Sequence, residues 1–312
     1  MKAMIFETYG GPEVLHEAEV PTPELKPGQV LVRVRLAAVN PYDLKLRSGA
    51  MQQNVHPTFP VIPGSELAGV VAAVGPALKS SVVESTVWPP LQVGDAVFGW
   101  GVGGSYAEFS AAKAVIRKPE DLHWETAASL VVAGATALRC LRQLAVTSGE
   151  TLLVHGGAGA VGSAAVQIAV HEGITVIATC SERDAEIVRE FGAHPVRYGE
   201  GFVERVRELA PDGVDAVLDT AGAGTLPGSI ELAGGVDRVL TIADTAAFAL
   251  GVTFSGGGAG EQTPDVLQKI ADLALSGVLT PPPTRHFPLT EAAQAQAALA
   301  AGGFRGKTLL DV

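Results

Sequence analysis

The hydrophobic pattern of the chain changes near residue 122. Before that point, short runs of β-branched and aromatic residues stand between glycines and prolines, for example at residues 29–39, 66–75 and 95–99. Such runs predict strands, and helical patterning is nearly absent before residue 120. We therefore expect residues 1–121 to form an antiparallel, partly barrel-like β domain.

Beyond residue 121, apolar runs alternate with segments of helical spacing. This alternation is typical of βαβ units around a parallel sheet. The sequence therefore predicts an α/β protein with a doubly wound parallel sheet in residues 122–285, followed by a strand, a helix and a strand in residues 286–312. The expected strands are 151–156, 175–180, 195–198, 214–220 and 238–243, and the expected helices are 123–144, 160–173, 182–192, 202–210 and 262–277.

The composition excludes several classes of protein. Lys and Arg total 22 against 33 Asp and Glu, which gives a formal charge of −11. A nucleic-acid binder needs a basic face, so we expect no nucleic-acid partner. The 2 cysteines cannot form a disulfide framework, and they fit a reducing cytosol. The first residues carry no apolar segment of a secretory signal, so we expect a cytoplasmic protein.

A mean hydropathy of +0.28 raises the question of a membrane span. The longest uncharged run, residues 151–171, contains 4 glycines and 2 histidines. A membrane helix needs about 20 predominantly apolar residues, so a strand, a turn and a helix explain this run better, and we expect no membrane partner. The segment Ser80–Pro90 lies in a connection longer than a turn needs; we interpret it as a tolerated surface insertion, with a functional loop as the alternative.

The strongest local motif is G-x-G-x-x-G, formed by Gly157, Gly159 and Gly162 with Ala160 and Val161 inside it. It follows a predicted strand and opens a predicted helix, which is the context of a dinucleotide-binding turn. The glycines permit a tight turn, a close approach of a pyrophosphate and the packing of helix on strand. The helix N-terminus then favours the anionic phosphates.

The choice of cofactor depends on the end of the strand at residues 175–180. NAD sites usually place Asp or Glu there for the ribose hydroxyls, whereas this strand is followed by Ser181, Glu182 and Arg183. Ser181 can donate to a 2′-phosphate, and Arg183 can pair with it. We therefore predict NADPH, although Glu182 would favour NADH if its carboxylate pointed into the site.

Five further motifs stand in one order along the chain. They are Asn40-Pro41-Tyr42-Asp43 with Arg47-Ser48-Gly49, Pro63-Gly64-Ser65-Glu66-Leu67-Ala68-Gly69, Gly104-Ser105-Tyr106-Ala107-Glu108-Phe109, Ala133-Gly134-Ala135-Thr136-Ala137 and Gly306-Lys307. Each is ordinary alone, but together they are specific. On these motifs the chain resembles, over essentially its whole length, the zinc-free quinone oxidoreductase branch of the medium-chain dehydrogenase/reductase family.

The resemblance implies a GroES-like catalytic domain in residues 1–121, completed by residues 286–312, with a Rossmann domain at 122–285 and a catalytic cleft between the domains. It also implies a homodimer paired through the Rossmann sheet edge, for which the apolar stretch 238–254 is a candidate.

Four further cofactor contacts are expected. The resemblance assigns Tyr198 to the NADPH 2′-phosphate and Thr136 to the neighbourhood of the nicotinamide and pyrophosphate. Thr220 and Ala243 stand at the C-terminal ends of later strands, where a cofactor would lie. The alternatives are that Tyr198 only packs at a strand end and that Thr136 only bonds within its helix.

No metal is predicted. In the segments that match the zinc ligands of alcohol dehydrogenases, this chain has Asn40, Ser65 and Ala133, none of which is a good zinc ligand. Glu66 remains, but one carboxylate does not make a site. The residues interpreted as structural are Cys140, Cys180 and His155.

Without a zinc Lewis acid, conjugate hydride transfer is the chemistry that needs the least help. A quinone or an activated alkene takes hydride at carbon, and the negative charge moves to a carbonyl oxygen. Asn40 can donate from its amide, and Tyr42 and Lys45 can donate hydrogen bonds or a proton, with solvent as another proton source. Lys45 is equally a candidate surface charge, and Asp43 is expected to be a hydrogen-bond acceptor. The residues expected in packing roles are Trp88 and Trp100.

The resulting hypothesis is an NADPH-dependent, zinc-independent oxidoreductase that transfers hydride to a quinone or to the C=C bond of an α,β-unsaturated carbonyl. Its expected partner is a small apolar carbonyl or quinone substrate. A pathway-specific enoyl reductase, acting on a carrier-bound or polyketide intermediate, would share every motif. A non-catalytic NADPH-binding sensor is the alternative outside enzymes, and a zinc alcohol dehydrogenase is disfavoured by its missing ligands.

Overall fold

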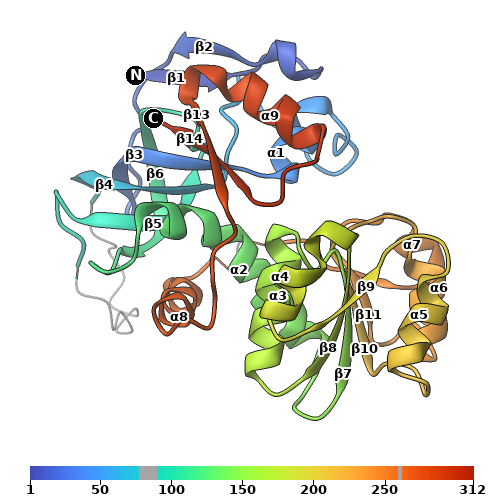
Figure 1. Ribbon diagram of the computed structural model, residues 1–312. Coiled ribbons are helices and arrows are strands. Elements are labelled where there is room, and N and C mark those ends of the chain that lie inside the picture. The colour runs from blue at the N-terminus through green and yellow to red at the C-terminus, as the bar shows by residue number, and fades with distance from the viewer. Residues whose placement is uncertain (77–89, 259–261) are drawn as a thin grey trace. The chain divides into compact units, whose positions relative to one another are not determined.

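The computed structural model describes residues 1–76, 90–258 and 262–312 (Figure 1). Backbone contacts divide the chain into two compact units. Unit one consists of Met1–Val132, Gln262–Asp272 and Pro283–Val312, and unit two of Ala133–Glu261 and Leu273–Pro282. Apart from Pro90, the predicted insertion Ser80–Pro90 lies outside the described residues, and so does Trp88.

The main sheet of unit one has six strands in the order β13-β14-β3-β4-β5-β6, and β3 also pairs with β6. The pair of β3 and β6 closes a ring of four antiparallel strands, so the prediction of an antiparallel, partly barrel-like β domain is confirmed. β13 and β14 run parallel to each other, and β14 is antiparallel to β3. The strands are β3 (Val30–Val39), β4 (Glu66–Val74), β5 (Ala96–Val102), β6 (Phe109–Arg117), β13 (Thr284–Pro288) and β14 (Lys307–Asp311).

A separate pair of strands and several helices complete unit one. β1 (Lys2–Ile5) pairs with β2 (His16–Glu19), and α9 (Ala292–Ala300) supplies Ala292 and Ala295 to the core of the unit. That core is made of valines and leucines from several strands, together with Tyr106. Two long helices cross the division between the units in sequence: α2 (Trp124–Leu144) and α8 (Pro264–Leu275).

The short helix α1 (Pro41–Ser48) was not expected from the pattern. Its sequence is polar, so hydrophobic periodicity does not reveal it, and end signals define it instead. Asn40 and Asp43 form a capping box, proline stands at the first position, and Gly49 ends the helix in a left-handed conformation at φ +79°. Arg47 is buried and donates from Nε to Gln296 of α9 at 2.6 Å, which ties the helix to the core.

Unit two contains the predicted parallel sheet, with six strands in the order β12-β11-β10-β7-β8-β9. In Figure 1, α3 and α4 lie on one side of the sheet and α5, α6 and α7 on the other, so the doubly wound arrangement is confirmed. The strand order reverses between β7 and β10, which is where such sheets bind ligands. The strands are β7 (Thr151–His155), β8 (Thr175–Cys180), β9 (His194–Arg197), β10 (Ala216–Asp219), β11 (Val239–Thr241) and β12 (Thr253–Phe254), and the helices are α3 (Ala160–His171), α4 (Ala185–Glu190), α5 (Phe202–Leu209), α6 (Leu226–Ala233) and α7 (Ala247–Leu250).

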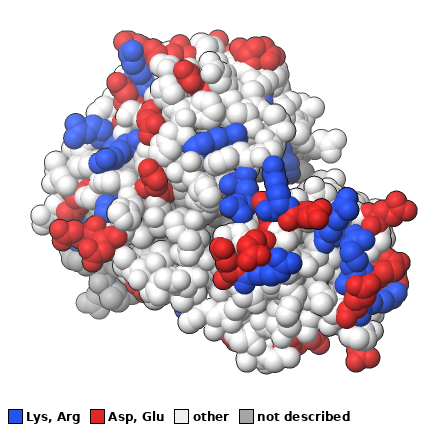
Figure 2. Space-filling model, viewed as in Figure 1, with Lys and Arg blue, Asp and Glu red and all other residues white. Residues whose placement is uncertain are grey.

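The surface charges and the hydropathy of the helices follow from the composition of the chain. On the face drawn in Figure 2, acidic and basic side chains are interspersed and form no continuous basic surface. Across the parts of the chain that the structure describes, no helix has the length and apolar character that crossing a membrane requires. Trp100 and both cysteines are buried, as predicted.

Candidate functional site

The glycine motif forms the turn between β7 and α3. Gly157 donates its N–H to Thr179 O at 2.9 Å, which fastens the turn to the end of β8. A Cβ on Gly157 would lie 2.6 Å from the Cβ of Ala178, and one on Gly162 would collide with the carbonyl oxygen of Gly156. α3 begins at Ala160 with Gly159 as its N-cap. These contacts require glycine for steric reasons and leave a helix N-terminus whose N–H groups suit a pyrophosphate.

A cavity of about 500 Å³ lies at the carboxyl ends of β8 and β9. It brings together Ser181 and Tyr198, two of the predicted contacts of a 2′-phosphate, whereas the predicted Arg183 does not line it. Arg183 is mostly exposed and lies 3.7 Å from Asp184. The residues that line the cavity are Ser181, Glu182, Arg197, Tyr198, Gly199, Glu200 and Arg205.

Sequence reasoning missed Arg197 and Arg205 of this cavity. Arg205 donates from Nε and Nη2 to Arg197 O, and from Nη2 to Gly199 O and Glu200 O, over distances of 2.9–3.3 Å. It thereby holds the turn that carries Tyr198, whose own N–H donates to Cys180 O at 3.2 Å. A basic residue in the first turn of the helix after a strand would have been the signal. The two glutamates of the cavity leave its charge balanced.

Two further predicted residues lie at neighbouring strand ends. Thr220 donates from Oγ1 to His155 O at 2.7 Å, which places it against the glycine turn. Ala243 follows β11 and donates its N–H to Thr241 Oγ1 at 3.1 Å. Thr136 lies in α2 and is half-buried. The structure thus brings Thr220 to the glycine turn and assigns no such contact to Thr136.

His155 is a buried core residue, as predicted. Its Nδ1 lies 3.2 Å from Thr179 Oγ1 and its Nε2 lies 3.0 Å from Ser229 Oγ. Burial lowers the pKa of His155 to about 4, and the nearby Asp219 carboxylate opposes that shift only in part. The imidazole is therefore neutral at physiological pH. It contacts Thr179, whose hydroxyl oxygen also accepts the N–H of Gly156 at 3.2 Å.

A second polar cluster lies in unit one, where α1 begins. Lys307 Nζ lies 2.5 Å from Glu66 Oε1 and donates to Asn40 Oδ1 at 2.6 Å, and Asn40 Nδ2 donates to Glu66 Oε1 at 2.8 Å. Glu66 Oε2 accepts the N–H of Val132 at 2.7 Å. The exposed fractions are 0% for Glu66, 3% for Lys307 and 6% for Asn40. We call Asn40, Glu66 and Lys307 the buried triad.

Asp43 acts as a hydrogen-bond acceptor, as predicted. Its Oδ2 accepts the N–H of Asn40 at 2.8 Å and the hydroxyl of Tyr106 at 3.1 Å. Its Oδ1 has no hydrogen-bond partner among the described residues. Burial raises the pKa of Asp43 to about 6, against the lowering effect of these hydrogen bonds.

Of the other predicted catalytic residues, Tyr42 and Lys45 are exposed on α1. Partial burial and the neighbouring Asp43 raise the pKa of Tyr42, so its hydroxyl is protonated at physiological pH. The side chain of Asn40, in contrast, is buried and uses Oδ1 and one N–H of Nδ2 within the buried triad.

A GroES-like β unit and a parallel-sheet nucleotide-binding unit define the class of the medium-chain dehydrogenases and reductases. The family described as "Alcohol dehydrogenase GroES-like domain" matches residues 26–120, and the one described as "Zinc-binding dehydrogenase" matches residues 191–310.

This chain is similar in sequence to known proteins along nearly its whole length. A chloroplastic NADPH-dependent alkenal/one oxidoreductase of Arabidopsis thaliana is 34% identical over 319 residues, covering 99% of this chain and 79% of the relative. The quinone oxidoreductase of Mus musculus is 31% identical over 339 residues, covering 99% and 97%. A mycobacterial structure solved with NADPH has 31% identity and a TM-score of 0.84, covering 100% of both chains. The chain belongs to the quinone oxidoreductase-like branch of the medium-chain dehydrogenase/reductase family.

The donor set does not fit the zinc that one family description implies. Asn40, Ser65 and Ala133 stand where that metal's ligands are expected, and the carboxylate of Glu66 is engaged by Lys307 and Asn40. Among the described residues, no group of three or more His, Cys, Asp or Glu side chains is placed to hold a metal ion. The glycine turn and the cavity at β8 and β9, in contrast, fit a dinucleotide.

Proposed function

We propose that this protein is an NADPH-dependent, zinc-independent reductase of quinones or α,β-unsaturated carbonyls, with small apolar substrates. The observation that carries the proposal is a glycine turn fit for a pyrophosphate together with a polar cluster that offers an amide and no zinc ligand set. Relatives named as alkenal/one and quinone oxidoreductases support it.

The cofactor residues bind and orient. The first-turn N–H groups of α3, at Ala160, Val161 and Gly162, would hold the pyrophosphate. Gly157 and Gly159 would let it approach the backbone, and Thr136, Thr220 and Ala243 would line its path. Tyr198 and Arg205 would hold the 2′-phosphate, with Arg183 as an outer charge. Ser181 would join them by turning its hydroxyl from Asp184 Oδ2, to which it donates at 2.6 Å. NADPH, when bound, supplies a hydride.

The residues of unit one then handle the charge that develops on the substrate. Hydride adds to the β-carbon, the π electrons move to the carbonyl oxygen, and a proton ends on the α-carbon. The remaining N–H of Asn40 donates to the developing oxyanion, which lowers the barrier. Tyr42, Lys45 or solvent supplies the proton.

The test is oxidation of NADPH by EDTA-treated protein, followed by nicotinamide absorbance, with a para-quinone and an α,β-unsaturated ketone in parallel and NADH as the comparison. Turnover with NADPH supports the proposal, and the better acceptor identifies the chemistry. NADPH binding without turnover on either acceptor would refute a general reductase and favour a dedicated pathway substrate or a sensor.

A hydroxyl deletion tests the preference for NADPH. Tyr198→Phe removes one donor to the 2′-phosphate, and we expect the KM for NADPH to rise about 10-fold, because a hydrogen bond to a charged group contributes about 1.5 kcal/mol or more. The KM for NADH should not change. The matched control is Tyr9→Phe, which alters a tyrosine packed on Phe59 in unit one. An equal rise for both cofactors would contradict a role at the phosphate.

We also propose a cytoplasmic homodimer. β12 is an end strand of its sheet, and the exposed Phe248 stacks on Phe254 beside it with ring centroids 5.3 Å apart. Cys140 and Cys180 are buried and form no disulfide, which suits a reducing compartment. Sedimentation of wild type and of Phe248→Glu tests the dimer, since a charge on this face should dissociate it.

A further inference from the structure

The buried triad places a cation where the family's metal description leads one to expect a metal. Thr308 pairs with Val39 across β14 and β3, and this register brings Lys307 beside Asn40. Glu66 is the first residue of β4, next to β3 in the same sheet. Segments far apart in the sequence therefore meet at one ammonium group, inside unit one.

Hydrogen-bond chemistry fixes which way the Asn40 amide faces. A lysine ammonium only donates, so the atom 2.6 Å from Nζ must be the amide oxygen. An ionised carboxylate only accepts, so the atom 2.8 Å from Glu66 Oε1 must be the amide nitrogen. A reversed amide would place two donors together at Lys307 and two acceptors together at Glu66. One N–H of Nδ2 is used by Glu66, and the second has no hydrogen-bond partner among the described residues.

We propose that Lys307 is a positioning residue, whose ammonium, acting with Glu66, locks the Asn40 amide so that its second N–H faces the developing oxyanion. The inference rests on the proposed function, in which Asn40 is the donor. Without the ammonium, Oδ1 loses its charged donor, and the amide can turn its oxygen toward the substrate. An oxygen there repels the negative charge that the nitrogen would stabilise.

The amide can be observed directly, because the sequence has asparagine at positions 40 and 54 alone. Protein labelled with ¹⁵N at asparagine side chains gives one amide signal from the buried Asn40 and one from the exposed Asn54, which is an internal reference. We expect the Asn40 side-chain protons of wild type to exchange with water at least 10-fold more slowly than those of Asn54.

Three variants test the lock. In Lys307→Met the exchange of Asn40 should approach that of Asn54, and Lys307→Arg should restore slow exchange because it keeps a cationic donor. Should Lys307→Met fail to fold, Lys307→Met with Glu66→Gln removes both charges and leaves no unpaired carboxylate. Slow exchange of Asn40 in these Met variants would overturn the inference, whether or not the protein has activity.

Kinetics separate positioning from mere stability. We expect the paired change Lys307→Met with Glu66→Gln to lower kcat/KM for the acceptor about 10- to 100-fold, with the KM for NADPH unchanged. In an Asn40→Ala background the same change should have no further effect. The control Lys118→Met removes an ammonium that binds the carbonyls of Pro119 and Leu122.

Each kinetic outcome has one meaning. Equal losses with and without Asn40 would overturn the inference, and so would a Lys118→Met loss as large as that of the paired change. Absence of turnover in wild type, with slow Asn40 exchange that depends on Lys307, would refute the proposed function alone.

Discussion

Two ion pairs of this chain have the same length in opposite surroundings. Lys307 and Glu66 approach to 2.5 Å with side chains that are 4% and 0% exposed. Arg238 and Glu150 also approach to 2.5 Å, but with side chains that are 34% and 26% exposed. The first pair lies in the sheet of unit one, and the second joins two loops of unit two.

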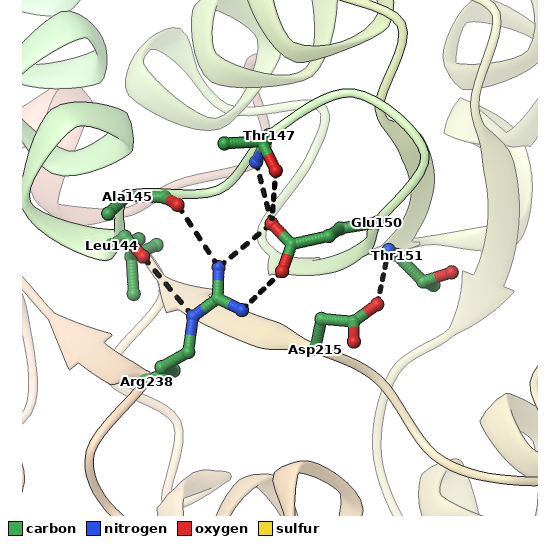
Figure 3. Close-up of polar contacts among 7 residues, drawn as sticks. All are labelled: Leu144, Ala145, Thr147, Glu150, Thr151, Asp215 and Arg238. Carbon is green, nitrogen blue, oxygen red and sulfur yellow. Dashed lines mark hydrogen bonds and ion pairs between the residues drawn. The ribbon is translucent and has the colours of Figure 1, made fainter.

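The exposed pair belongs to a local network of hydrogen bonds (Figure 3). Arg238 contacts both oxygens of Glu150 and donates to the carbonyls of Leu144 and Ala145, where α2 ends. Glu150 also accepts the N–H of Thr147 at 2.6 Å. The cluster therefore closes the turn between α2 and β7.

The distance between the charges does not by itself determine how much an ion pair contributes to stability. Water screens the exposed pair, and pairs of that kind contribute little to stability. Inside the sheet there is no such screening, and removing one partner leaves a charge that nothing solvates. Disruption of the buried pair is therefore expected to destabilise the fold more than disruption of the exposed pair.

The largest effect is expected from Lys307→Met. It leaves Glu66 buried without its counter-charge, so the free energy of unfolding should fall by about 3–5 kcal/mol. Urea denaturation followed by tryptophan fluorescence measures this. Adding Glu66→Gln should recover most of the loss. A loss no greater than that of Arg238→Met would mean that the two pairs do not differ in the way their burial indicates.

The next effect concerns Asp43, which adjoins the buried triad. Its pKa rises from 3.8 to about 6 on folding, so the folded state binds the proton more tightly. The stabilising contribution is fully present below pH 3.8 and is lost as the pH rises through about 6. Over this window, wild type should lose on the order of 2–3 kcal/mol relative to Asp43→Asn, which does not titrate. A constant difference between the two proteins would contradict it.

Glu150 gives a smaller effect of opposite sign. Its hydrogen bonds with Arg238 and with the N–H of Thr147 lower its pKa from 4.5 to about 2. Its contribution is therefore present above pH 4.5 and is lost as the pH falls through about 2. Acid unfolding of Glu150→Gln should lack this component, and raised salt should weaken it in wild type. If the two proteins unfold identically at low pH, the pairing of Glu150 with Arg238 in solution is refuted.

The smallest effect is expected from Arg238→Lys. Lysine keeps the charge but cannot reach both carboxylate oxygens and the two carbonyls together, so the melting temperature should fall slightly, and less at high salt. Arg207→Lys is a matched control, because Arg207 contacts Glu231 at 2.5 Å on the surface. A decrease as large as that of Lys307→Met would overturn the distinction between the pairs.

Local sequence was enough to predict much of unit two. A strand, a glycine motif and a helix follow one another within residues 151–171, and Gly162 is required by its contact with Gly156 in the same segment. Ser181 was predicted from the residues that follow the strand at 175–180, and Tyr198 from the resemblance to the family; both line the cavity. Arg205 was missed because a basic residue in the first turn of a helix does not by itself show that it donates to the carbonyls of a neighbouring turn.

The buried triad could not be assembled from the sequence. Asn40 and Glu66 are 26 residues apart, and Lys307 lies 267 residues from Asn40. A lysine in a polar C-terminal strand looks the same whether its ammonium is solvated or buried. Only the register of β14 against β3 reveals the difference. The predicted domain limits, 121/122 and 285/286, and the assigned site residues stay predictions.

The place of β14 inside its sheet bears on how the polypeptide is made. The ribosome releases residues 36–39 of β3 long before residues 308–311, their partners, exist. During that interval the nascent chain exposes an unpaired, apolar strand edge, the kind that joins other chains. Translation of the intervening unit sets the length of this vulnerable period. Slowed elongation, or a stop before residue 307, should therefore channel the product toward chaperones or proteolysis.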